Sequence, residues 1–369
     1  MSKFQLSKSI TKSGIGIVYA GGTFGSYGKP LASLDADIFL PVLSQILQTH
    51  FATYPNHAHD PVDWRILDNE VIKDSSQLSP ADFAHFYQLI VQAIGQGLRQ
   101  FVVLTGTDTL SYLAAFLAEC FAGSHISIVV TGAMRPLLDS NVLTDYLIAP
   151  QSDATQNLFD ACKLARHGEP GVRVCFSGED WPAQTVQKIH SHDLMAFVGH
   201  HRAGYPANSY TSKITQAQHQ LWLEDRLSQL PQVFDSLSHA NIATLYLTPV
   251  DTHLLATRLD NLLSEKPDAI IILAFGAGNV PYAESIKNQL LQAKKQGCLV
   301  AVTTQCAYGG VSQAYEAGAW LAQCEVLMTG RLTLPAIFAR LLWLIGSYDT
   351  PARRRQRWAH CLKDTHTVA

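Results

Sequence analysis

The sequence predicts an α/β protein, with a mostly parallel sheet covered by helices in a larger N-terminal domain and a smaller C-terminal α/β domain. Three observations support this fold class. Short apolar runs alternate with longer amphipathic segments along most of the chain. The apolar runs are continuous rather than alternating, which is typical of strands buried on both faces of a parallel sheet. Several of these runs end in glycine, as expected where a buried strand opens into a tight loop.

The N-terminal half contains the clearest alternation. We expect strands at residues 15–20, 63–68, 101–106, 126–132 and 172–178. Helical patterns separate them at residues 79–94, 109–121 and 153–166. Ser79 and Pro80 mark the start of the first of these helices, because serine caps helix N-termini and proline suits the first turn.

Residues 202–240 differ in character, being rich in Gln, Ser, Pro and His without a convincing strand. We interpret them as an interdomain connection with one helix near residues 214–228. The alternation then resumes, with strands at 243–248, 269–276 and 298–304 and helices at 251–264, 282–296, near 312–322 and, as the final helix, 333–346. The expected division is a catalytic domain over 1–205, a linker over 206–239 and a C-terminal domain over 240–369.

Composition excludes several classes of function. The 369 residues carry a formal net charge of -3, which indicates no general affinity for nucleic acid or acidic membranes. The seven cysteines form no CxxC pair, so reduced thiols in a cytoplasmic protein fit best. No signal peptide is visible, and no apolar stretch approaches the about 20 residues of a membrane span. The 15 histidines lack the spacing of known metal sites, so we expect no metal. The basic run at 351–358 is expected to be a solvated helix face.

Ligands of parallel α/β sheets bind outside the carboxyl ends of the strands, which directs attention to four loops. They are "GGTFGS" (21–26), "DSS" (74–76), "TGTDT" (105–109) and "TGAMRP" (131–136). The first and third each present a threonine directly after a glycine. Glycine permits unusual turns and the close approach of a ligand, so the two threonines are candidate functional residues.

Thr107 and Asp108 admit two interpretations from spacing alone. Asp108 could cap a helix that starts at Thr109, with Thr107 merely part of the turn. Alternatively, the hydroxyl and the carboxylate point together at a ligand. Phosphate is a poor candidate, because "GGTFGSYGK" has no GK[ST] ending and a carboxylate repels anions. A carboxylate at this position suits a substrate with an ammonium group.

Taken together and in order, "YAGGTFGS", "DSSQLSP", "VLTGTDTLSYLA" and "VVTGAMRP" resemble the signature segments of the bacterial-type L-asparaginase family. "QKIHSHDLMAF" (187–197) is similar to the lysine segment of the family, and "AFGAGNVP" (274–281) and "TTQCAYGGV" (303–311) are similar to its C-terminal motifs. The resemblance covers residues 15–200 and 240–346. Without a visible signal peptide, the chain is more similar to the cytoplasmic type I branch than to the periplasmic type II branch.

The resemblance implies hydrolysis of L-asparagine to L-aspartate and ammonia through a threonine acyl-enzyme, with no cofactor. Thr23 matches the threonine that attacks the amide carbon. Thr107, Asp108 and Lys188 match a second group, in which the lysine activates the hydroxyl of Thr107 for deacylation and Asp108 binds the substrate ammonium. A lysine in a partly desolvated site can give up its proton near neutral pH, which makes such a relay feasible.

Four further positions carry roles implied by the resemblance. Ser75 matches the residue that binds the substrate α-carboxylate, and Ser76 its neighbour, although "DSS" could instead be only the turn before the next helix. Ala133 and Thr107 offer backbone N–H groups as oxyanion donors at strand-to-loop turns. Tyr27 matches a tyrosine that activates the first threonine and shares its loop.

The sequence departs from the family pattern in places, and rival functions stay open. "RLT" (331–333) stands where an Asp-Met-Thr sequence is common, "GAMRP" replaces Gly-Ser-Gln, and the loop after Thr23 lacks a long polar insert. These changes bear on affinity and specificity. A glutaminase-leaning or broader amidase is an alternative, as one methylene changes discrimination by only about 1–3 kcal/mol. A non-catalytic amino-acid sensor and a tRNA-dependent amidotransferase subunit are further alternatives. We expect a homodimer or homotetramer.

Overall fold

The computed structural model describes residues 14–53, 63–139, 147–167, 170–199, 215–311 and 316–366. Its larger sheet has the strand order β4-β1-β5-β6-β7-β8. The strands are β1 (Ile15–Tyr19), β4 (Trp64–Ile66), β5 (Gln100–Leu104), β6 (Ser127–Thr131), β7 (Gly171–Phe176) and β8 (Glu179–Pro182). All neighbours pair in parallel except β7 and β8, which are antiparallel. The prediction of a mostly parallel sheet is therefore confirmed.

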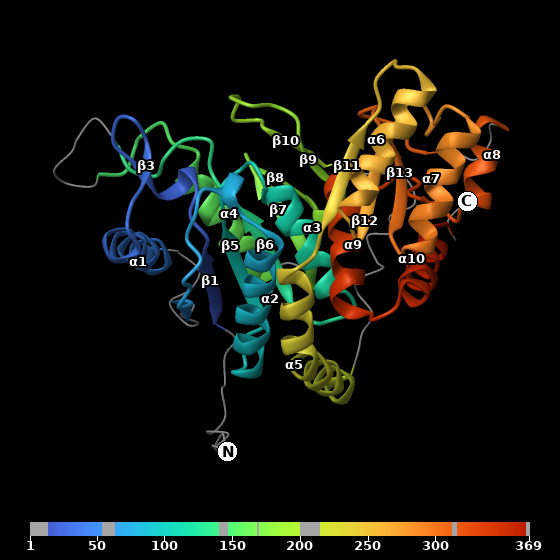
Figure 1. Ribbon diagram of the computed structural model, residues 1–369. Helices are drawn as coiled ribbons and strands as arrows, with labels where there is room; N and C mark the ends of the chain where they lie inside the picture. Colours follow the sequence, from blue (N-terminus) through green and yellow to red (C-terminus); the bar gives the residue numbers. More distant parts are fainter. Residues whose placement is uncertain are drawn as a thin grey trace.

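Helices cover both faces of this sheet (Figure 1). Alternate residues of the central strands enter two different cores, since successive strand side chains point to opposite faces. Val103 and Val130 pack with helices α2 (Pro80–Gly95) and α3 (Leu110–Cys120), whereas Leu104 and Val129 pack with α1 (Ala36–Thr53) and α4 (Ala154–His167). This double burial explains why the strands are apolar along their whole length.

The second sheet, in the yellow-to-red half of Figure 1, has four parallel strands in the order β11-β12-β13-β14. They are β11 (Ile242–Tyr246), β12 (Ala269–Ala274), β13 (Leu299–Thr304) and β14 (Leu327–Met328). The helices of this region are α6 (Thr252–Ser264), α7 (Glu284–Lys295), α8 (Glu316–Gln323), α9 (Leu334–Ser347) and α10 (Pro351–His366). The expected smaller C-terminal α/β unit is thus present.

A single hydrophobic core joins the two sheets through α9. Ile271 and Ala301 of the second sheet, Leu342 of α9 and Phe116 of α3 belong to the same buried cluster. A nearly buried ion pair reinforces this contact, with Arg340 Nε of α9 donating to Glu119 Oε1 of α3 at 3.1 Å. The two sheets are therefore packed together rather than loosely tethered.

Helix α5 (Gln216–Ser238) connects the two halves and lies beside α2 (Figure 1). Our expected helix near 214–228 is too short, because the helix continues to Ser238. Leu230, Val233 and Leu237 supply the reason, since they recur at helical spacing and are buried in the shared core. The domain limits at 205 and 240 stay a prediction, and residues 200–214 lie outside the described ranges.

Several elements differ from the sequence prediction. Helix α1 and the hairpin of β9 (Val186–Lys188) and β10 (Phe197–Gly199) were not expected. The helix at 333–346 is not the final one, because α10 follows it. The solvated face expected at 351–358 is wrong for two arginines: Arg354 Nε donates to Tyr348 O at 2.8 Å, and Arg355 Nη2 donates to Cys298 O at 3.2 Å.

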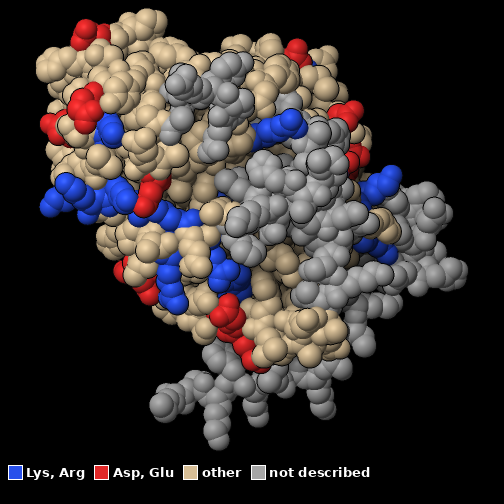
Figure 2. All heavy atoms as spheres, turned by 90° about the vertical axis from the view of Figure 1, so that its right-hand side faces the viewer, with Lys and Arg blue, Asp and Glu red and all other residues tan. Residues whose placement is uncertain are grey.

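The C-terminal side of the molecule carries mixed charges. Figure 2, which faces this side, shows a band of Lys and Arg side chains with Asp and Glu side chains beside it. Within the described ranges, every helix is too short or too polar to traverse a lipid bilayer.

Candidate active site

The loops that follow β1 and β5 both leave the carboxyl-terminal end of the sheet, and they contact each other. The two strands pair in parallel with Tyr19 opposite Leu104. A Cβ atom built on Gly22 would lie 2.2 Å from Gly106 Cα, and Gly22 has a φ of 81°. Only glycine permits both that conformation and this approach. Because Thr23 and Thr107 directly follow these glycines, the contact brings the two threonine loops together.

Thr23 begins a short 3₁₀ turn, η1 (Thr23–Gly25), that is packed from several sides. Ser26 Oγ donates to Gly22 O at 3.1 Å. Leu137 N, in the loop after β6, donates to Phe24 O at 3.1 Å. Thr23 itself is half-buried. The turn is thus fixed on both sides of the threonine, while its side chain keeps access to solvent.

Tyr27 lies on the same loop, four positions after Thr23. It belongs to β2 (Ser26–Tyr27), which pairs antiparallel with β3 (Ala32–Ser33). Its half-buried ring packs against the core on the α1 side of the sheet. The loop therefore continues as a small hairpin that carries both residues.

Thr107, Asp108 and Lys188 form one hydrogen-bonded group. Lys188 Nζ donates to Thr107 Oγ1 at 2.9 Å and to Asp108 Oδ1 at 2.8 Å. The Thr107 residue is 7% exposed, and the Lys188 and Asp108 side chains are 21% and 59% exposed. The group thus runs from a buried hydroxyl to an accessible carboxylate, which suits a polar substrate that enters from outside.

The alternative role of Asp108 as a helix cap is wrong. Helix α3 begins at Leu110, its N-cap residue is Thr109, and no side chain caps it. The Asp108 carboxylate pairs with Lys188 instead. The second interpretation, in which the hydroxyl and the carboxylate point together at a ligand, stays a prediction.

Lys188 reaches this group because it ends strand β9 of a hairpin that the sequence did not reveal. Phe197 of β10 lies opposite Lys188 in the antiparallel pair. A Cβ atom on Gly199 would fall 2.0 Å from the Trp181 ring, so the hairpin packs directly on β8. The turn before β9 is tied to α9, because Thr333 Oγ1 donates to Gln184 O at 3.1 Å.

Ser75 lies between the loop after β4 and the Thr107 turn. It is buried, with Asp108 N donating to its Oγ at 3.2 Å and Thr109 Oγ1 donating to its carbonyl at 2.8 Å. Ser76 is exposed, and its N–H and hydroxyl donate to Asp74 Oδ1 at 2.8 and 2.7 Å. These bonds lower the pKa of Asp74. The structure places Ser75 in contact with the Thr107–Asp108 turn, whereas the Ser76 hydroxyl is hydrogen-bonded to Asp74 within its own turn.

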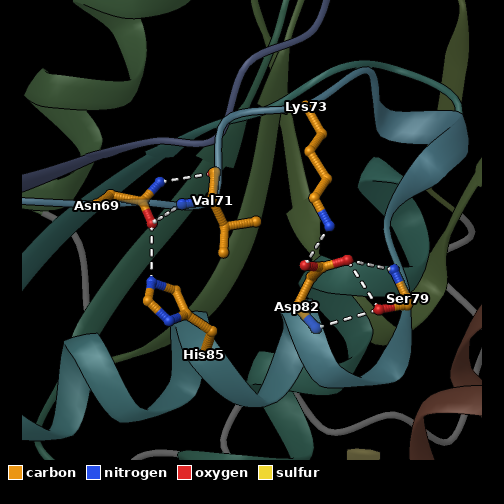
Figure 3. A network of polar contacts seen from close by, with 6 residues as sticks. All are labelled: Asn69, Val71, Lys73, Ser79, Asp82 and His85. Carbon is orange, nitrogen blue, oxygen red and sulfur yellow. Dashed lines mark hydrogen bonds and ion pairs between the residues drawn. The ribbon is translucent and has the colours of Figure 1, made fainter.

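A polar network anchors the loop that carries Ser75 (Figure 3). Lys73 Nζ donates to Asp82 Oδ1 at 2.7 Å, and Ser79 N donates to Asp82 Oδ2 at 2.8 Å, completing the capping box of α2. Burial opposes ionisation of Asp82, but the hydrogen bonds from Lys73 and Ser79 outweigh it and lower the pKa of this carboxyl. The start of α2 at Ser79 and Pro80 is confirmed. The Ser-x-x-Asp spacing of Ser79 and Asp82 is typical of a capping box, so the sequence could have predicted the contact between these two residues.

Asn69 anchors the other end of the same loop. Its Nδ2 donates to Tyr19 O at 2.7 Å. The same nitrogen donates to Val71 O at 2.8 Å, and Asn69 Oδ1 lies 3.0 Å from the His85 ring nitrogen Nε2 (Figure 3). Lys73 N also donates to Ala20 O at 3.1 Å. The Ser75 loop is thereby fixed to both the end of β1 and the start of α2.

Ala133 follows β6 and is fully buried beside the Thr105 backbone. A Cβ atom on the preceding residue, Gly132, would lie 2.3 Å from Thr105 O. The next two backbone N–H groups, of Met134 and Arg135, donate to the Asp153 carboxylate at 2.9 and 3.0 Å. The fourth predicted loop therefore also lies beside the Thr105–Thr109 turn.

The two C-terminal motifs form loops at the carboxyl end of the second sheet. Gln305 Nε2 donates to Leu247 O and Leu273 O at 2.6 and 2.8 Å, and Val311 N donates to Gly330 O at 2.7 Å. These contacts hold the motifs to their own sheet. Across the described ranges, no group of three or more His, Cys, Asp or Glu residues could hold a metal ion.

The chain is similar in sequence and in fold to known proteins. An L-asparaginase from Thermococcus kodakarensis is 28% identical over 275 residues, covering 74% of this chain and 77% of that protein. The L-asparaginase 1 of Escherichia coli K12 is 26% identical and covers 93% of this chain and 95% of its own length. The solved structure of the thermostable Thermococcus kodakarensis L-asparaginase matches with a TM-score of 0.66 at 24% identity, over 93% of this chain and 96% of that one.

Two family models account for most of the sequence. The model for the asparaginase N-terminal domain matches residues 14–221, which include every candidate site residue. The model for the glutaminase/asparaginase C-terminal domain matches residues 241–357. The chain therefore belongs to the asparaginase family.

Proposed function

We propose that this protein hydrolyses the side-chain amide of L-asparagine to L-aspartate and ammonia, through an acyl-enzyme on Thr23 and without a cofactor. The observation that carries the proposal is the hydrogen bonding of Lys188 to both Thr107 and Asp108. This group lies beside the Gly22–Gly106 contact from which Thr23 begins. The proposed nucleophile Thr23, the proposed proton relay through Thr107, and the proposed ammonium-binding carboxylate of Asp108 thus lie at the same carboxyl-terminal end of the sheet.

In the acylation half of the reaction, Thr23 Oγ1 attacks the amide carbon. Its proton passes to the phenol oxygen of Tyr27, which shares its loop, and the phenol releases its own proton to the amide nitrogen. The tetrahedral oxyanion accepts hydrogen bonds from the backbone N–H groups of Thr107 and Ala133. Collapse of this intermediate breaks the C–N bond, and the nitrogen, with the proton from Tyr27, leaves as ammonia. The aspartyl group stays esterified to Thr23.

In the deacylation half, a water molecule attacks the ester carbonyl. The Thr107 hydroxyl accepts the proton of this water and passes its own to the Lys188 amine, whose Nζ lies 2.9 Å from Thr107 Oγ1. Collapse releases L-aspartate, and the Thr23 oxygen takes up the proton that Lys188 accepted, which restores the starting enzyme. The pairing of a buried hydroxyl with a lysine supports this general-base role.

Substrate binding uses the two side chains next to Thr107. One oxygen of the Asp108 carboxylate pairs with Lys188, and the 59% exposure of this side chain leaves room for the substrate ammonium. The buried Ser75 hydroxyl is proposed to bind the α-carboxylate. Ser76 contributes by forming the turn with Asp74 that presents Ser75.

The test is ammonia release from L-asparagine by the purified protein, with EDTA present to exclude an adventitious metal. Thr23→Ala and Thr107→Ala should each lower kcat by about 10³-fold or more while the protein stays folded. Thr257→Ala is the matched control, because Thr257 is an exposed threonine of α6. Full activity in either of the first two variants would overturn the two-threonine mechanism.

A glutaminase-leaning or broader amidase is the second candidate, favoured by the match to a glutaminase/asparaginase C-terminal model. Comparing kcat/KM for L-asparagine and L-glutamine decides between them, since one methylene is worth about 1–3 kcal/mol in a pocket. Tight binding of asparagine without ammonia release would instead indicate a sensor. Ammonia transfer that depends on a charged tRNA would indicate an amidotransferase subunit.

We also propose a cytoplasmic protein of the type I branch that forms a homodimer or homotetramer and binds neither nucleic acid nor membranes. Supporting observations are the net charge of -3 and the cysteines that occur as free thiols, namely Cys120, Cys162, Cys175, Cys298, Cys306 and Cys324. Light scattering after size exclusion measures the oligomeric state, and fractionation of cells that express the native gene tests the compartment.

A further inference from the structure

We propose that Asn157 is a positioning residue that holds the Ala133 loop and the Lys188 hairpin in one fixed relation. Asn157 lies on α4, and its side chain is hydrogen-bonded to Gly132, Asp153 and Ser177, none of which is a proposed reacting group. The inference rests on the proposed function for its kinetic consequences. Its structural part can be tested without any activity.

The first arm runs from Asn157 to the Ala133 loop. Asn157 Nδ2 donates to Gly132 O at 2.9 Å, directly before Ala133. The same amide nitrogen donates to Asp153 Oδ2 at 3.1 Å. The Asp153 carboxylate in turn accepts the N–H groups of Met134 and Arg135 at 2.9 and 3.0 Å. Three of these four bonds hold backbone groups on the two sides of Ala133, at Gly132, Met134 and Arg135.

The second arm runs from Asn157 to the hairpin that carries Lys188. Ser177 N donates to Asn157 Oδ1 at 2.9 Å, and Ser177 Oγ donates to Leu194 O at 2.5 Å. Leu194 lies in the connection between β9 and β10, two residues before Ala196. Ala196 O accepts the N–H of Ile189, the residue after Lys188, at 2.8 Å. The chain of bonds thus ends beside Lys188.

The chemistry of this position requires a buried amide. Asn157 is 1% exposed, and it supplies a donor to one arm and an acceptor to the other. Aspartate would set a carboxylate oxygen against Gly132 O and the Asp153 carboxylate. Leucine would leave Gly132 O and Ser177 N without these hydrogen bonds, and an unpaired buried polar group destabilises the fold.

The strained backbone of Ser177 gives its hydrogen bond to Asn157 a second structural role. Ser177 has a φ of 52°, a conformation that residues other than glycine rarely adopt. The bond from its N–H to Asn157 Oδ1 and the bond from its hydroxyl to Leu194 O hold it there. Loss of either bond allows the turn after β7 to relax. The connection between β9 and β10, which Ser177 contacts through Leu194, would then shift as well.

The two arms predict different kinetic defects. The Ala133 loop supplies a proposed oxyanion donor, so disturbing it slows acylation and lowers kcat/KM. The Lys188 hairpin supplies the base of deacylation, so disturbing it lowers kcat, leaves kcat/KM unchanged and lets the aspartyl-enzyme accumulate. Misplacement of a reacting group by about 1 Å costs about 100-fold in rate, so shifts below 1 Å suffice for a measurable effect.

The experiment compares four variants of the full chain with L-asparagine as substrate. Ser177→Ala cuts only the hairpin arm, Asp153→Asn cuts the loop arm, and Asn157→Asp disturbs both. Gln156→Leu is the matched control, an exposed neighbour on the same helix whose amide nitrogen donates to Asp160. Steady-state kinetics and intact-protein mass spectrometry after rapid acid quench give kcat, KM and the fraction of acyl-enzyme.

The expected result for Asn157→Asp is a fall in both kcat and kcat/KM of about 10- to 100-fold. Ser177→Ala should lower kcat alone and accumulate acyl-enzyme, and Asp153→Asn should lower kcat/KM without accumulation. Asn157→Asp kinetics equal to those of Gln156→Leu in folded protein would overturn the inference. So would indistinguishable defects from the two single-arm variants.

Hydrogen exchange without substrate separates this inference from the proposed function. Asn157→Asp should speed amide exchange in peptides covering both 133–136 and 188–196, whereas Gln156→Leu should change neither. If Asn157→Asp fails to fold, Ser177→Ala should still speed exchange in 188–196 only. Unchanged exchange refutes the positioning role. A wild-type protein that releases no ammonia refutes the proposed function instead, and the exchange result still stands.

Discussion

Gly22 and Gly106 lie in backbone contact, so that a Cβ atom on the first would come within 2.2 Å of the Cα atom of the second. This contact joins the loops of two strands that are separated by more than 80 positions in sequence. It also places Thr23 and Thr107 one residue beyond the point of contact. The main chain therefore brings the two threonine residues to the same place in the fold.

Replacing Gly22 by alanine should abolish activity and destabilise the fold. Gly123→Ala is the control, since Gly123 has a similar positive φ of 73° but nothing within 4 Å of a built Cβ. Gly123→Ala should cost only about 1–2 kcal/mol of backbone strain and keep full activity. Gly22→Ala adds the steric clash, so its loss of stability should be larger. Chemical denaturation and ammonia release measure both effects, and equal behaviour of the two variants would contradict the role of the contact.

Removing the Lys188 amine should lower kcat by about 10²- to 10⁴-fold, the usual contribution of a positioned acid or base. Lys188→Met keeps much of the side-chain volume but loses the bonds to Thr107 and Asp108. Lys163→Met, at an exposed position of α4, is the control. If the lysine acts through Thr107, the double variant with Thr107→Val should be little worse than either single variant. Strictly additive losses in kcat would show that Lys188 and Thr107 act independently.

Cutting the anchor of the Ser75 loop should raise KM more than it lowers kcat. Asp82→Asn loses the ion pair with Lys73 and weakens the capping box, whereas Lys73→Met loses only the ion pair. Both should increase KM for L-asparagine, and Asp82→Asn should also cost about 1–3 kcal/mol of unfolding free energy. If KM were unchanged in both variants, the Ser75 loop would hold its position without this network.

The lowered pKa of Asp82 makes the anchor acid-sensitive. Because the unfolded state binds the proton more readily, stability is present above the usual Asp pKa of about 3.9 and is lost as the pH falls through the lower folded value. Thermal melts of wild type and Asp82→Asn should therefore converge below about pH 3.9. A constant difference in Tm across this range would contradict the assignment.

His219 should make the fold sensitive to milder acid. Its ring is buried, neither ring nitrogen has a hydrogen-bond partner among the described residues, and burial, with Arg99 and His125 nearby, lowers its pKa. Below the unfolded histidine value of about 6.5, the unfolded chain takes up a proton that the folded chain resists, so stability falls. His219→Leu should reduce this loss between about pH 6.5 and 5. His253→Leu, at an exposed histidine, should leave the pH dependence of Tm unchanged.

The order of strands and helices in the first half was readable because the evidence for it is local. Apolar runs of strand length and the Ser79–Pro80 start predicted β1, β5, β6 and α2 within one or two residues. Helix α1 was missed because Pro41 interrupts its pattern. The end of α5 was missed because Pro231 lies inside that helix. In both cases tertiary packing of apolar residues maintains a helix through a residue that disfavours it.

The sequence by itself determined which residue types stand at the ends of the strands: Thr23 and Thr107 after glycines, and Asp108 beside the second. It could not determine their partners. Lys188 looks like any surface lysine in a local window, and only the packing of its hairpin on β8 aims it at Thr107. Asn157 likewise carries no local signal. Local sequence specifies backbone conformation through steric and periodic constraints, whereas contacts between residues far apart depend on how the elements pack, and these contacts assemble the site.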